Sequence, residues 1–278
     1  MKNKNLKMTW EEAVLWLKAQ EDKAELIRNC YFDDPIESSA ARFHQGVEWQ
    51  KTKNLLPKML GKVLDLGAGR GQSSYALAKD GWAVTSLDPD PSHVVGTGAI
   101  RELAKRTGID IEIIDAKGEA LPFAADSFDL VYTRQALHHS EDLYKLLKEI
   151  YRVCRPGGTF IAVREHVVDS ERDKELFLES HPLHEVYDQE NAYLLIEYLK
   201  AITEAGFILS KTLNPLETPI NYYPLTRDDI VRSLLRKISG IEISVKINQL
   251  FPDILLKIAG DYFLKTPGRL YTFVAQKI

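Results

Sequence analysis

Three glycines at alternate positions, Gly67, Gly69 and Gly71, follow a short apolar run in the stretch "VLDLGAGRG" at residues 63–71. Because glycine has no Cβ, the backbone can turn sharply there, and a ligand can lie directly against it. A strand that ends in such a turn before a helix is typical of α/β sheets that bind ligands at the carboxyl ends of their strands. A tight turn without a ligand is the simpler interpretation of the glycines taken alone.

Short apolar runs alternate with helical patterns over residues 62–166. The pattern predicts strands at residues 62–67, 83–88, 111–115, 128–134 and 159–166. Helices are predicted at 72–81 and 94–108 and from His138 onward, the last of them stopped by Pro156-Gly157-Gly158. Two later strands are expected at residues 207–215 and 268–278. This alternation predicts an α/β fold, with a mostly parallel sheet and crossover helices on both of its faces.

The rest of the chain reads as helical additions to that sheet. We expect an N-terminal helical cap at residues 1–50, a core at 51–214 and 268–278, and a helical insert or lid at 215–267. Residues 6–29 and 169–206 also have helical patterns. Neither a signal peptide nor a membrane span is expected, so we expect a cytoplasmic protein that makes no membrane contact.

The net charge and the cysteine content limit which binding partners and metal sites the chain is expected to have. The formal net charge of −4 disfavours a nucleic-acid partner and leaves a small-molecule substrate as the expectation. Cys30 and Cys154 fit no metal-binding spacing, so we expect free thiols. The oligomeric state stays open.

The two carboxylates near the glycines indicate the kind of ligand. A dinucleotide fingerprint would place its third glycine at position 72, which is Gln72, and Asp65 would repel a pyrophosphate. A phosphate-free ligand with a cationic end suits Asp65 better. S-adenosylmethionine has that chemistry, and Asp88, at the end of the second strand, can accept hydrogen bonds from its ribose hydroxyls.

Four motifs in series resemble those of the class I S-adenosylmethionine-dependent methyltransferases. They are "VLDLGAGRG", "SLDPD", "GEALPFAADSFDLVYTRQALHH" and "LKEIYRVCRPGGTFIAV", and the resemblance covers roughly residues 40–168. It implies a Rossmann-like sheet of seven strands whose last strand is antiparallel, with S-adenosylmethionine bound across the carboxyl ends of the strands. Residues 268–278 would be that last strand, paired with 207–215.

The same resemblance implies which residues bind the cofactor. Asp88 would hold the ribose, and Pro89 would border the adenine. The methionine end would lie against the loop residues Asp65, Gly67, Ala68 and Gly69.

Two further positions complete this cofactor set. Lys117 stands where the family usually has an acidic residue, and because lysine only donates hydrogen bonds, the adenine contact would come from backbone at Lys117, Gly118 and Glu119. Arg134 follows the fourth strand, where the family usually contacts the methionine moiety through the backbone.

Methyl transfer from a sulfonium needs alignment and exclusion of water, and a base if the nucleophile must lose a proton. We take His166, at the end of the fifth strand, and His139 as the candidate catalytic residues, with His138 a weaker candidate. No metal is expected, because a His-x-x-His pattern is weak evidence. The metal ligands considered are His166, His181, His184 and Glu185.

The methyl acceptor is constrained only weakly. "TRQALHH" stands in place of the (Asp/Asn)-Pro-Pro-aromatic signature of enzymes that act on planar amines, which favours an oxygen acceptor on a metabolite, sugar or phosphoryl compound. Arg134, Arg164 and His166 could then hold an anionic substrate. The alternatives are a small-molecule N-methyltransferase, a non-catalytic cofactor-binding module and a nicotinamide-dependent oxidoreductase.

Overall fold

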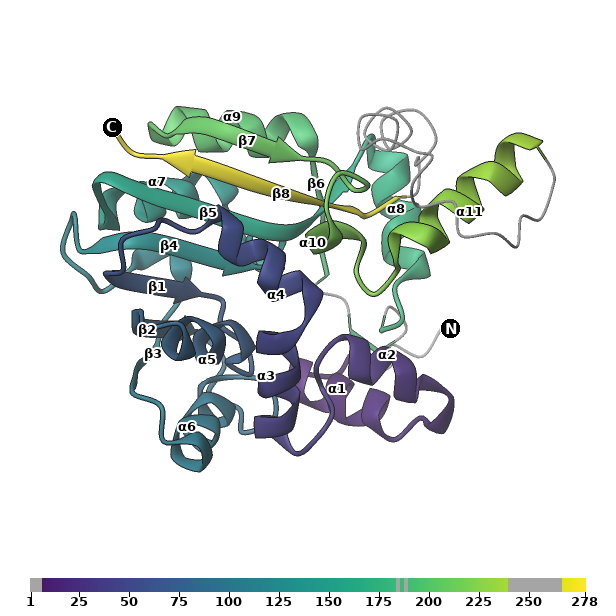
Figure 1. Cartoon of the computed structure of the whole chain (residues 1–278), viewed down its shortest axis with the longest axis horizontal. Coiled ribbons are helices and arrows are strands. Elements are labelled where there is room, and N and C mark those ends of the chain that lie inside the picture. Colours follow the sequence, from purple (N-terminus) through teal and green to yellow (C-terminus); the bar gives the residue numbers. More distant parts are fainter. Residues whose placement is uncertain (1–6, 184–185, 188–189, 240–266) are drawn as a thin grey trace, which may run out of the picture.

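A computed structural model describes residues 7–183, 186–187, 190–239 and 267–278. Its centre is a single sheet with the strand order β3-β2-β1-β4-β5-β8-β7 (Figure 1). The strands are β1 (Lys62–Leu66), β2 (Ala83–Asp88), β3 (Ile111–Asp115), β4 (Phe128–Arg134), β5 (Cys154–Val168), β6 (Tyr193–Leu194), β7 (Ile208–Leu213) and β8 (Arg269–Gln276). β8 is antiparallel to both neighbours, and the other ladders are parallel.

This order confirms the predicted α/β sheet with its antiparallel last strand between β5 and β7. The short strand β6 was not predicted; it pairs with the end of β5 and brings the described sheet to eight strands. The topology places the carboxyl ends of β1, β2, β4 and β5 along one edge, where α/β sheets bind ligands.

Helices cover both faces of the sheet (Figure 1). They are α1 (Trp10–Lys18), α2 (Ala24–Asn29), α3 (Ile36–Gln45), α4 (Val47–Thr52), α5 (Gln72–Lys79), α6 (Thr97–Thr107), α7 (Leu143–Val153), α8 (Glu171–Ser180), α9 (Leu195–Ala205), α10 (Pro219–Tyr222) and α11 (Arg227–Ser239). Side chains alternate between the faces, so Tyr132 packs with α4 and α5 while Val131 packs with α7 and α9. Tyr31, Phe43 and Trp49 are fully buried on the first of these faces.

Three boundaries differ from the prediction. The helix expected from His138 up to the stop at Pro156-Gly157-Gly158 begins only at Leu143, where Asp142 caps its first turn, and ends at Val153, after which the chain continues directly into β5. Residues 169–206 split into α8 and α9, because Pro182 forces His181 into an extended conformation. The helical pattern at residues 6–29 divides into α1 and α2, with Gln20 extended between them.

The late insert is described only in part. Residues 219–239 contain α10 and α11, as the helical pattern predicts, while 240–266 lie outside the described residues.

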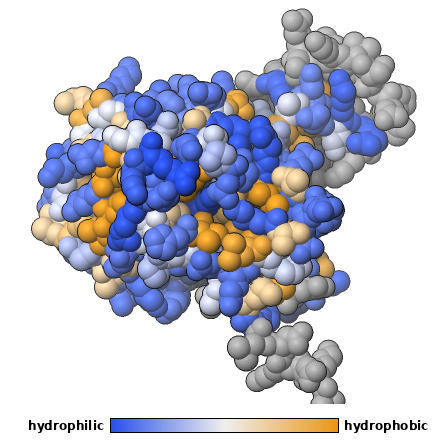
Figure 2. Space-filling view, turned by 90° about the horizontal axis from the view of Figure 1, so that it is seen from below, coloured by the Kyte–Doolittle hydropathy of each residue, from blue (hydrophilic) through white to orange (hydrophobic). Residues whose placement is uncertain are grey.

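Seen from below, the surface is mostly hydrophilic, with hydrophobic side chains gathered in separate patches (Figure 2).

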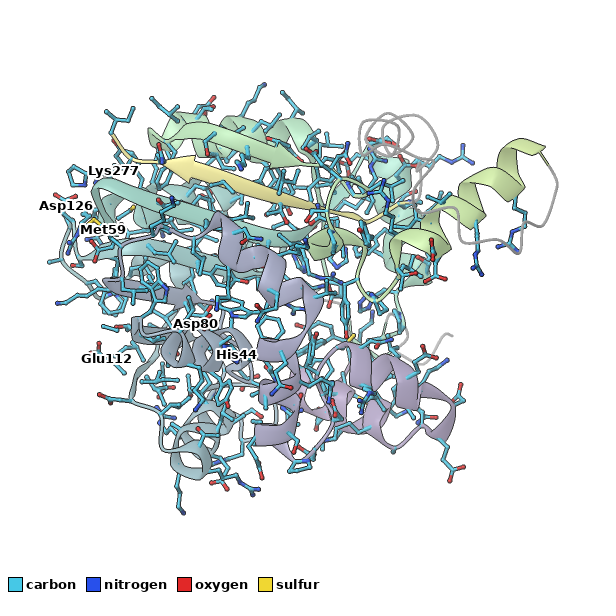
Figure 3. The ribbon with its side chains drawn as sticks, viewed as in Figure 1. His44, Met59, Asp80, Glu112, Asp126 and Lys277 are labelled. Atoms are coloured by element: carbon cyan, nitrogen blue, oxygen red, sulfur yellow. The ribbon has the colours of Figure 1, made fainter. Side chains whose placement is uncertain are left out.

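An ion pair and a hydrogen bond far from the strand edge link separate parts of the chain. The ammonium of Lys277 lies 2.7 Å from a carboxylate oxygen of Asp126 and so ties the end of β8 to the loop before β4 (Figure 3). His44 on α3 lies 3.0 Å from Asp80, which follows α5 (Figure 3).

Candidate active site

A cavity of about 990 Å³ opens at the carboxyl ends of β1, β2, β4 and β5. The glycine loop after β1 and the end of β2 line one part of it. Residues of α1 and α2, together with Phe177, Ser180, His181, Pro182, Leu183, Tyr187 and Glu190, line another. The cavity is large enough to take a nucleoside cofactor together with a small second molecule. We call its two parts the cofactor end and the acceptor end.

The glycine loop has the geometry that a close ligand requires. Gly67 and Gly69 have φ angles of +69° and +54°, which favour glycine. A Cβ on Gly67 would lie 2.5 Å from the Cβ of Ala136, so no other residue fits there without movement. Ala68 also lines the cavity beside them.

Asp88 is the last residue of β2, and both Asp88 and Pro89 line the cofactor end of the cavity. One carboxylate oxygen accepts a hydrogen bond from the backbone N–H of Gly69 at 2.8 Å, and the other accepts from that of Asp90 at 3.0 Å. Burial raises the pKa of Asp88 to about 6. Each oxygen keeps acceptor capacity for a ribose hydroxyl, so the residue fits its expected place beside the cofactor.

Asp65 occupies a different place from the one expected. Its side chain is fully buried and is not part of the cavity wall. One carboxylate oxygen accepts hydrogen bonds from the hydroxyls of Ser73 and Ser74 at 2.7 and 2.5 Å, and burial raises the pKa to about 6. In this structure Asp65 therefore anchors the first turn of α5, and direct contact with the methionine end stays a prediction.

Residues 117–119 line the cofactor end as a short 3-10 turn (Gly118–Ala120) preceded by Lys117. The ammonium of Lys117 points to Glu141 at 2.9 Å, and its side chain is 68% exposed. Lys117, Gly118 and Glu119 thus all line the cavity, while the ammonium of Lys117 is engaged by Glu141.

Arg134 and Arg164 do not form the predicted anion-binding cluster with His166. The guanidinium of Arg134 makes two hydrogen bonds to the buried carboxylate of Glu48, at 2.6 and 3.1 Å. Arg164 lies 3.9 Å from the same carboxylate, donates to the carbonyls of Ile220 and Tyr223, and is not part of the cavity wall. Both guanidiniums thus serve the packing of α4 and α10 on the sheet.

The acceptor end gathers histidines from three parts of the chain. Nδ1 of His166 lies 2.8 Å from the carbonyl oxygen of Gly268, and its ring packs on those of His138 and Phe177 at centroid distances of 4.8 and 4.7 Å. His139 is exposed to the cavity, and its ring centroid lies 4.1 Å from that of His138. Burial lowers the pKa values of His138 and His166 to about 3, so both imidazoles are neutral.

Two glutamates complete this end, and sequence reasoning missed both. Glu165 is fully buried, and its carboxylate lies 2.8 Å from Nδ1 of His138. Glu190 lies 3.9 Å from Nε2 of His138 and 3.8 Å from Nε2 of His181, and burial raises its pKa to about 7. Glu165 directly precedes His166, the candidate at the end of a predicted strand, and this position could have marked Glu165 as a site residue. Nothing in the pattern after Pro182 marks Glu190, and His184 and Glu185 lie outside the described residues.

Comparisons with known proteins agree with this geometry. Residues 64–162 match the family model described as a methyltransferase domain. The sarcosine/dimethylglycine N-methyltransferase of Halorhodospira halochloris is 39% identical over 102 residues, which is 36% of this chain and 36% of that protein.

Solved structures share the fold over most of the chain. Geranyl diphosphate C-methyltransferase from Streptomyces coelicolor, solved with S-adenosyl-L-homocysteine, has a TM-score of 0.58 at 14% identity. The match covers 90% of this chain and 87% of that protein's chain. A putative sarcosine dimethylglycine methyltransferase from Galdieria sulphuraria has a TM-score of 0.56 at 18% identity, and the match covers 89% of this chain and 90% of that protein's chain.

Sheet order, glycine loop and family match together define an α/β nucleoside-binding methyltransferase fold. Residues 64–162 form a methyltransferase domain of class I, whose cofactor is S-adenosylmethionine. The chain spans about a third of the length of the first curated relatives that it matches. In the part of the chain that the structure describes, no helix is both long and apolar enough to cross a membrane.

Proposed function

We propose that this chain transfers a methyl group from S-adenosylmethionine to an amine nitrogen of a small polar acceptor. The observation that carries the proposal is the single cavity that joins the glycine loop and Asp88 to the histidines of the acceptor end. Cofactor and acceptor would meet inside one cavity, which allows the alignment that an in-line transfer requires.

At the cofactor end, Asp88 would accept the ribose hydroxyls, and the loop of Gly67, Ala68 and Gly69 would let the methionine end lie against the backbone. Pro89 and the backbone of residues 117–119 would border the adenine, and Arg134 would contribute backbone only. When bound, S-adenosylmethionine supplies the methyl group: the C–S electrons stay on sulfur, the nitrogen lone pair forms the new C–N bond, and a primary or secondary amine then releases a proton.

Charge at the cavity wall favours an amine over a sugar phosphate or other phosphoryl acceptor. Each Lys or Arg side chain in the described wall already has a carboxylate partner: Arg70 has Asp34, Lys117 has Glu141 and Arg134 has Glu48. No free cation is therefore offered to a phosphate by the described residues. Curated relatives of the methyltransferase domain include N-methyltransferases for sarcosine and dimethylglycine, which supports nitrogen over the oxygen that the sequence favoured.

His166 is proposed to orient the acceptor. Because its Nδ1 donates to the Gly268 carbonyl, its Nε2 carries the lone pair and can accept a hydrogen bond from an acceptor N–H. His139, which also lines the cavity, is proposed as a second contact to the acceptor.

The test has two stages. Calorimetry first measures the binding of S-adenosyl-L-homocysteine, and labelled S-adenosylmethionine then measures transfer to glycine, sarcosine, dimethylglycine and a matched set of small alcohols. Transfer to an amine supports the proposal. Transfer to alcohols alone contradicts it and shows that the acceptor atom is oxygen. Binding without transfer to any acceptor in metabolite extracts indicates a non-catalytic module.

Variants separate the roles of the residues. His166→Ala is expected to slow turnover by at least tenfold and to leave the affinity for S-adenosyl-L-homocysteine within twofold. His44→Ala is the matched control, since His44 pairs with Asp80 outside the cavity (Figure 3). Full activity of His166→Ala ends its candidacy.

A further inference from the structure

We propose that His138, His139 and Glu190 bind a divalent transition-metal ion at the acceptor end of the cavity. One ligand atom from each residue lies within 4.8 Å of the other two. Nε2 of His138 lies 3.9 Å from a carboxylate oxygen of Glu190. Metal–nitrogen bonds of about 2.0–2.1 Å place neighbouring ligands about 3–3.5 Å apart, so a small movement of side chains closes the site.

His138 is held in the orientation that a metal ligand needs. Its Nδ1 lies 2.8 Å from Glu165, which directs Nε2 toward Glu190. Glu165 is itself fixed by the backbone N–H groups of Ala136, Leu137 and His138, at 3.1–3.2 Å. A carboxylate behind a histidine is the usual outer partner of a metal-bound imidazole, because it fixes the tautomer and raises the basicity of the ligating nitrogen.

Charge balance also favours a cation at this place. Glu165 is fully buried and the side chain of Glu190 is 8% exposed, yet neither carboxylate has a Lys or Arg partner among the described residues. The partners of Glu165 are backbone N–H groups and the His138 ring, none of them a Lys or Arg cation, and a divalent ion would offset the charge of both carboxylates.

The donor set indicates the class of metal. Two imidazoles and one carboxylate suit Zn²⁺, Fe²⁺ or Co²⁺ better than Mg²⁺ or Ca²⁺, which prefer oxygen ligands. Nε2 of His181 lies 3.8 Å from the other oxygen of Glu190 and could supply a fourth ligand. The sequence suggested a different set of ligands, His166, His181, His184 and Glu185. Here the histidines at positions 138 and 139 follow β4, some fifty positions before Glu190 in the chain.

The role of the ion rests on the proposed function. Because the cations of the described wall are already paired, a metal would be the group that receives an anionic oxygen of the acceptor. The acceptor class would then be a small amine that also carries a carboxylate, with its oxygen on the metal and its nitrogen toward the methyl group.

Metal binding is tested on the full chain, without a polyhistidine tag and after treatment with a chelator. Co²⁺ and Zn²⁺ are titrated by calorimetry, Co²⁺ also by its visible absorption, and the bound metal is counted by mass spectrometry. One equivalent is expected, with an affinity at least tenfold weaker in His139→Ala and Glu190→Gln. Glu165→Gln, which alters a positioning residue, is expected to weaken binding by about 10- to 100-fold and to shift the Co²⁺ spectrum.

The controls keep the outcomes distinct. His44→Ala should bind metal as the wild type does, and circular dichroism confirms that each variant is folded. Absence of saturable binding, or wild-type affinity in both His139→Ala and Glu190→Gln, overturns the metal site. Amine methylation that persists at the full rate in the metal-free protein overturns the role of the ion and leaves the proposed function standing. Failure to bind S-adenosyl-L-homocysteine overturns the proposed function and leaves the metal site standing.

Discussion

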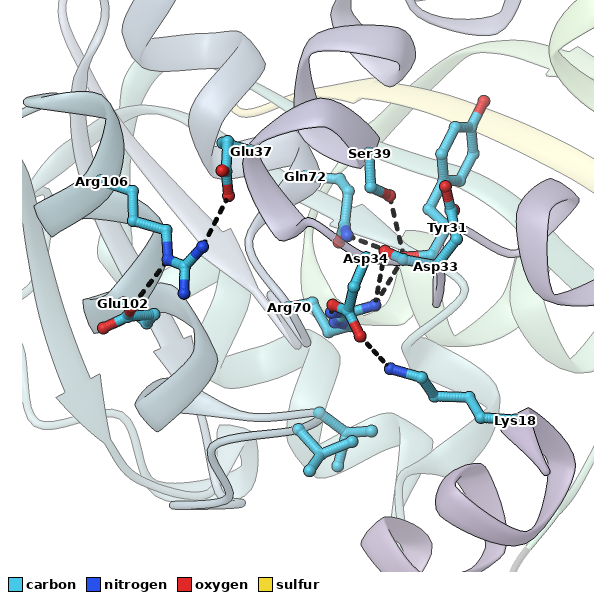
Figure 4. Close-up of polar contacts among 12 residues, drawn as sticks. Lys18, Tyr31, Asp33, Asp34, Glu37, Ser39, Arg70, Gln72, Glu102 and Arg106 are labelled. Carbon is cyan, nitrogen blue, oxygen red and sulfur yellow. Dashed lines mark hydrogen bonds and ion pairs between the residues drawn. The ribbon is translucent and has the colours of Figure 1, made fainter.

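Nη2 of Arg70 lies 2.6 Å from a carboxylate oxygen of Asp34, and this contact joins the glycine loop before α5 to the turn before α3 (Figure 4). Nη1 of the same guanidinium donates to the carbonyl of Tyr31 at 3.1 Å, and Lys18 on α1 also pairs with Asp34. The side chain of Arg70 is 5% exposed. The N-terminal helices and the cofactor loop are therefore expected to move as one unit.

A double-mutant cycle on Arg70 and Asp34 tests this coupling. We expect Arg70→Ala to lower the free energy of unfolding by about 2 kcal/mol, with a coupling energy to Asp34→Ala of about 1 kcal/mol. Arg106→Ala is the control, because Arg106 pairs with Glu37 and Glu102 while 47% exposed (Figure 4), and should change the stability little. Losses that simply add in the double variant of Arg70 and Asp34, measured by urea unfolding, contradict the coupling.

Asp88→Ala should weaken the binding of S-adenosyl-L-homocysteine by about 1–3 kcal/mol, because a charged acceptor of hydrogen bonds is lost. Isothermal calorimetry at pH 7.5 measures the change. Asp115→Ala is the matched control: Asp115 ends the neighbouring strand β3, pairs with Arg101 and lies outside the cavity wall. An unchanged dissociation constant in Asp88→Ala removes this residue from the ribose.

Asp65 should make stability depend on pH in a defined direction. Burial raises its folded-state pKa from 3.8 to about 6. Its stabilising contribution is therefore fully present below pH 3.8 and is lost as the pH rises through about 6. Relative to Asp65→Asn, the wild type should lose about 3 kcal/mol of unfolding free energy between pH 4 and pH 7, as urea denaturation can measure. A difference that stays constant or grows over this range contradicts the assignment.

The fully buried carboxylate of Glu48 lies beside the guanidiniums of both Arg134 and Arg164, so its removal should be severe. We expect Glu48→Ala to lower the free energy of unfolding by about 3–5 kcal/mol, because Arg134 and Arg164 lose their compensating charge. Glu112→Ala is the control, since Glu112 lies at the edge of the sheet on β3 and accepts a bond from Thr85 (Figure 3). Similar losses for the two variants, measured in urea, would rule out a special role for Glu48.

Local patterns predicted the sheet well. The strands and their mostly parallel arrangement follow from the alternation of apolar runs and helical patterns, and the antiparallel last strand was implied by the resemblance to class I methyltransferases. The glycine loop and Asp88 line the cavity as expected. Pro156-Gly157-Gly158 marked the end of α7 near its observed place at Val153, whereas the start was placed five residues early, because the cap that Asp142 provides was not recognised.

Partners distant in the chain could not be predicted from the sequence. Arg134 was expected near an anionic substrate, yet it pairs with Glu48, which lies 86 positions away. Asp65 was expected to face a cation, and its partners are two serines of the following helix. Residue type limits what a side chain can bind, but tertiary packing chooses among the candidates.

The position of β8 between β5 and β7 carries a consequence for how the sheet assembles. Because residues 269–276 hold β7 in place, β7 has no ladder to join until this distant segment arrives. The Gly268 carbonyl that fixes the His166 ring arrives with the same segment. Nascent polypeptides released before Arg269 should thus expose two unsatisfied backbone edges, invite intermolecular aggregation and lack a finished acceptor pocket.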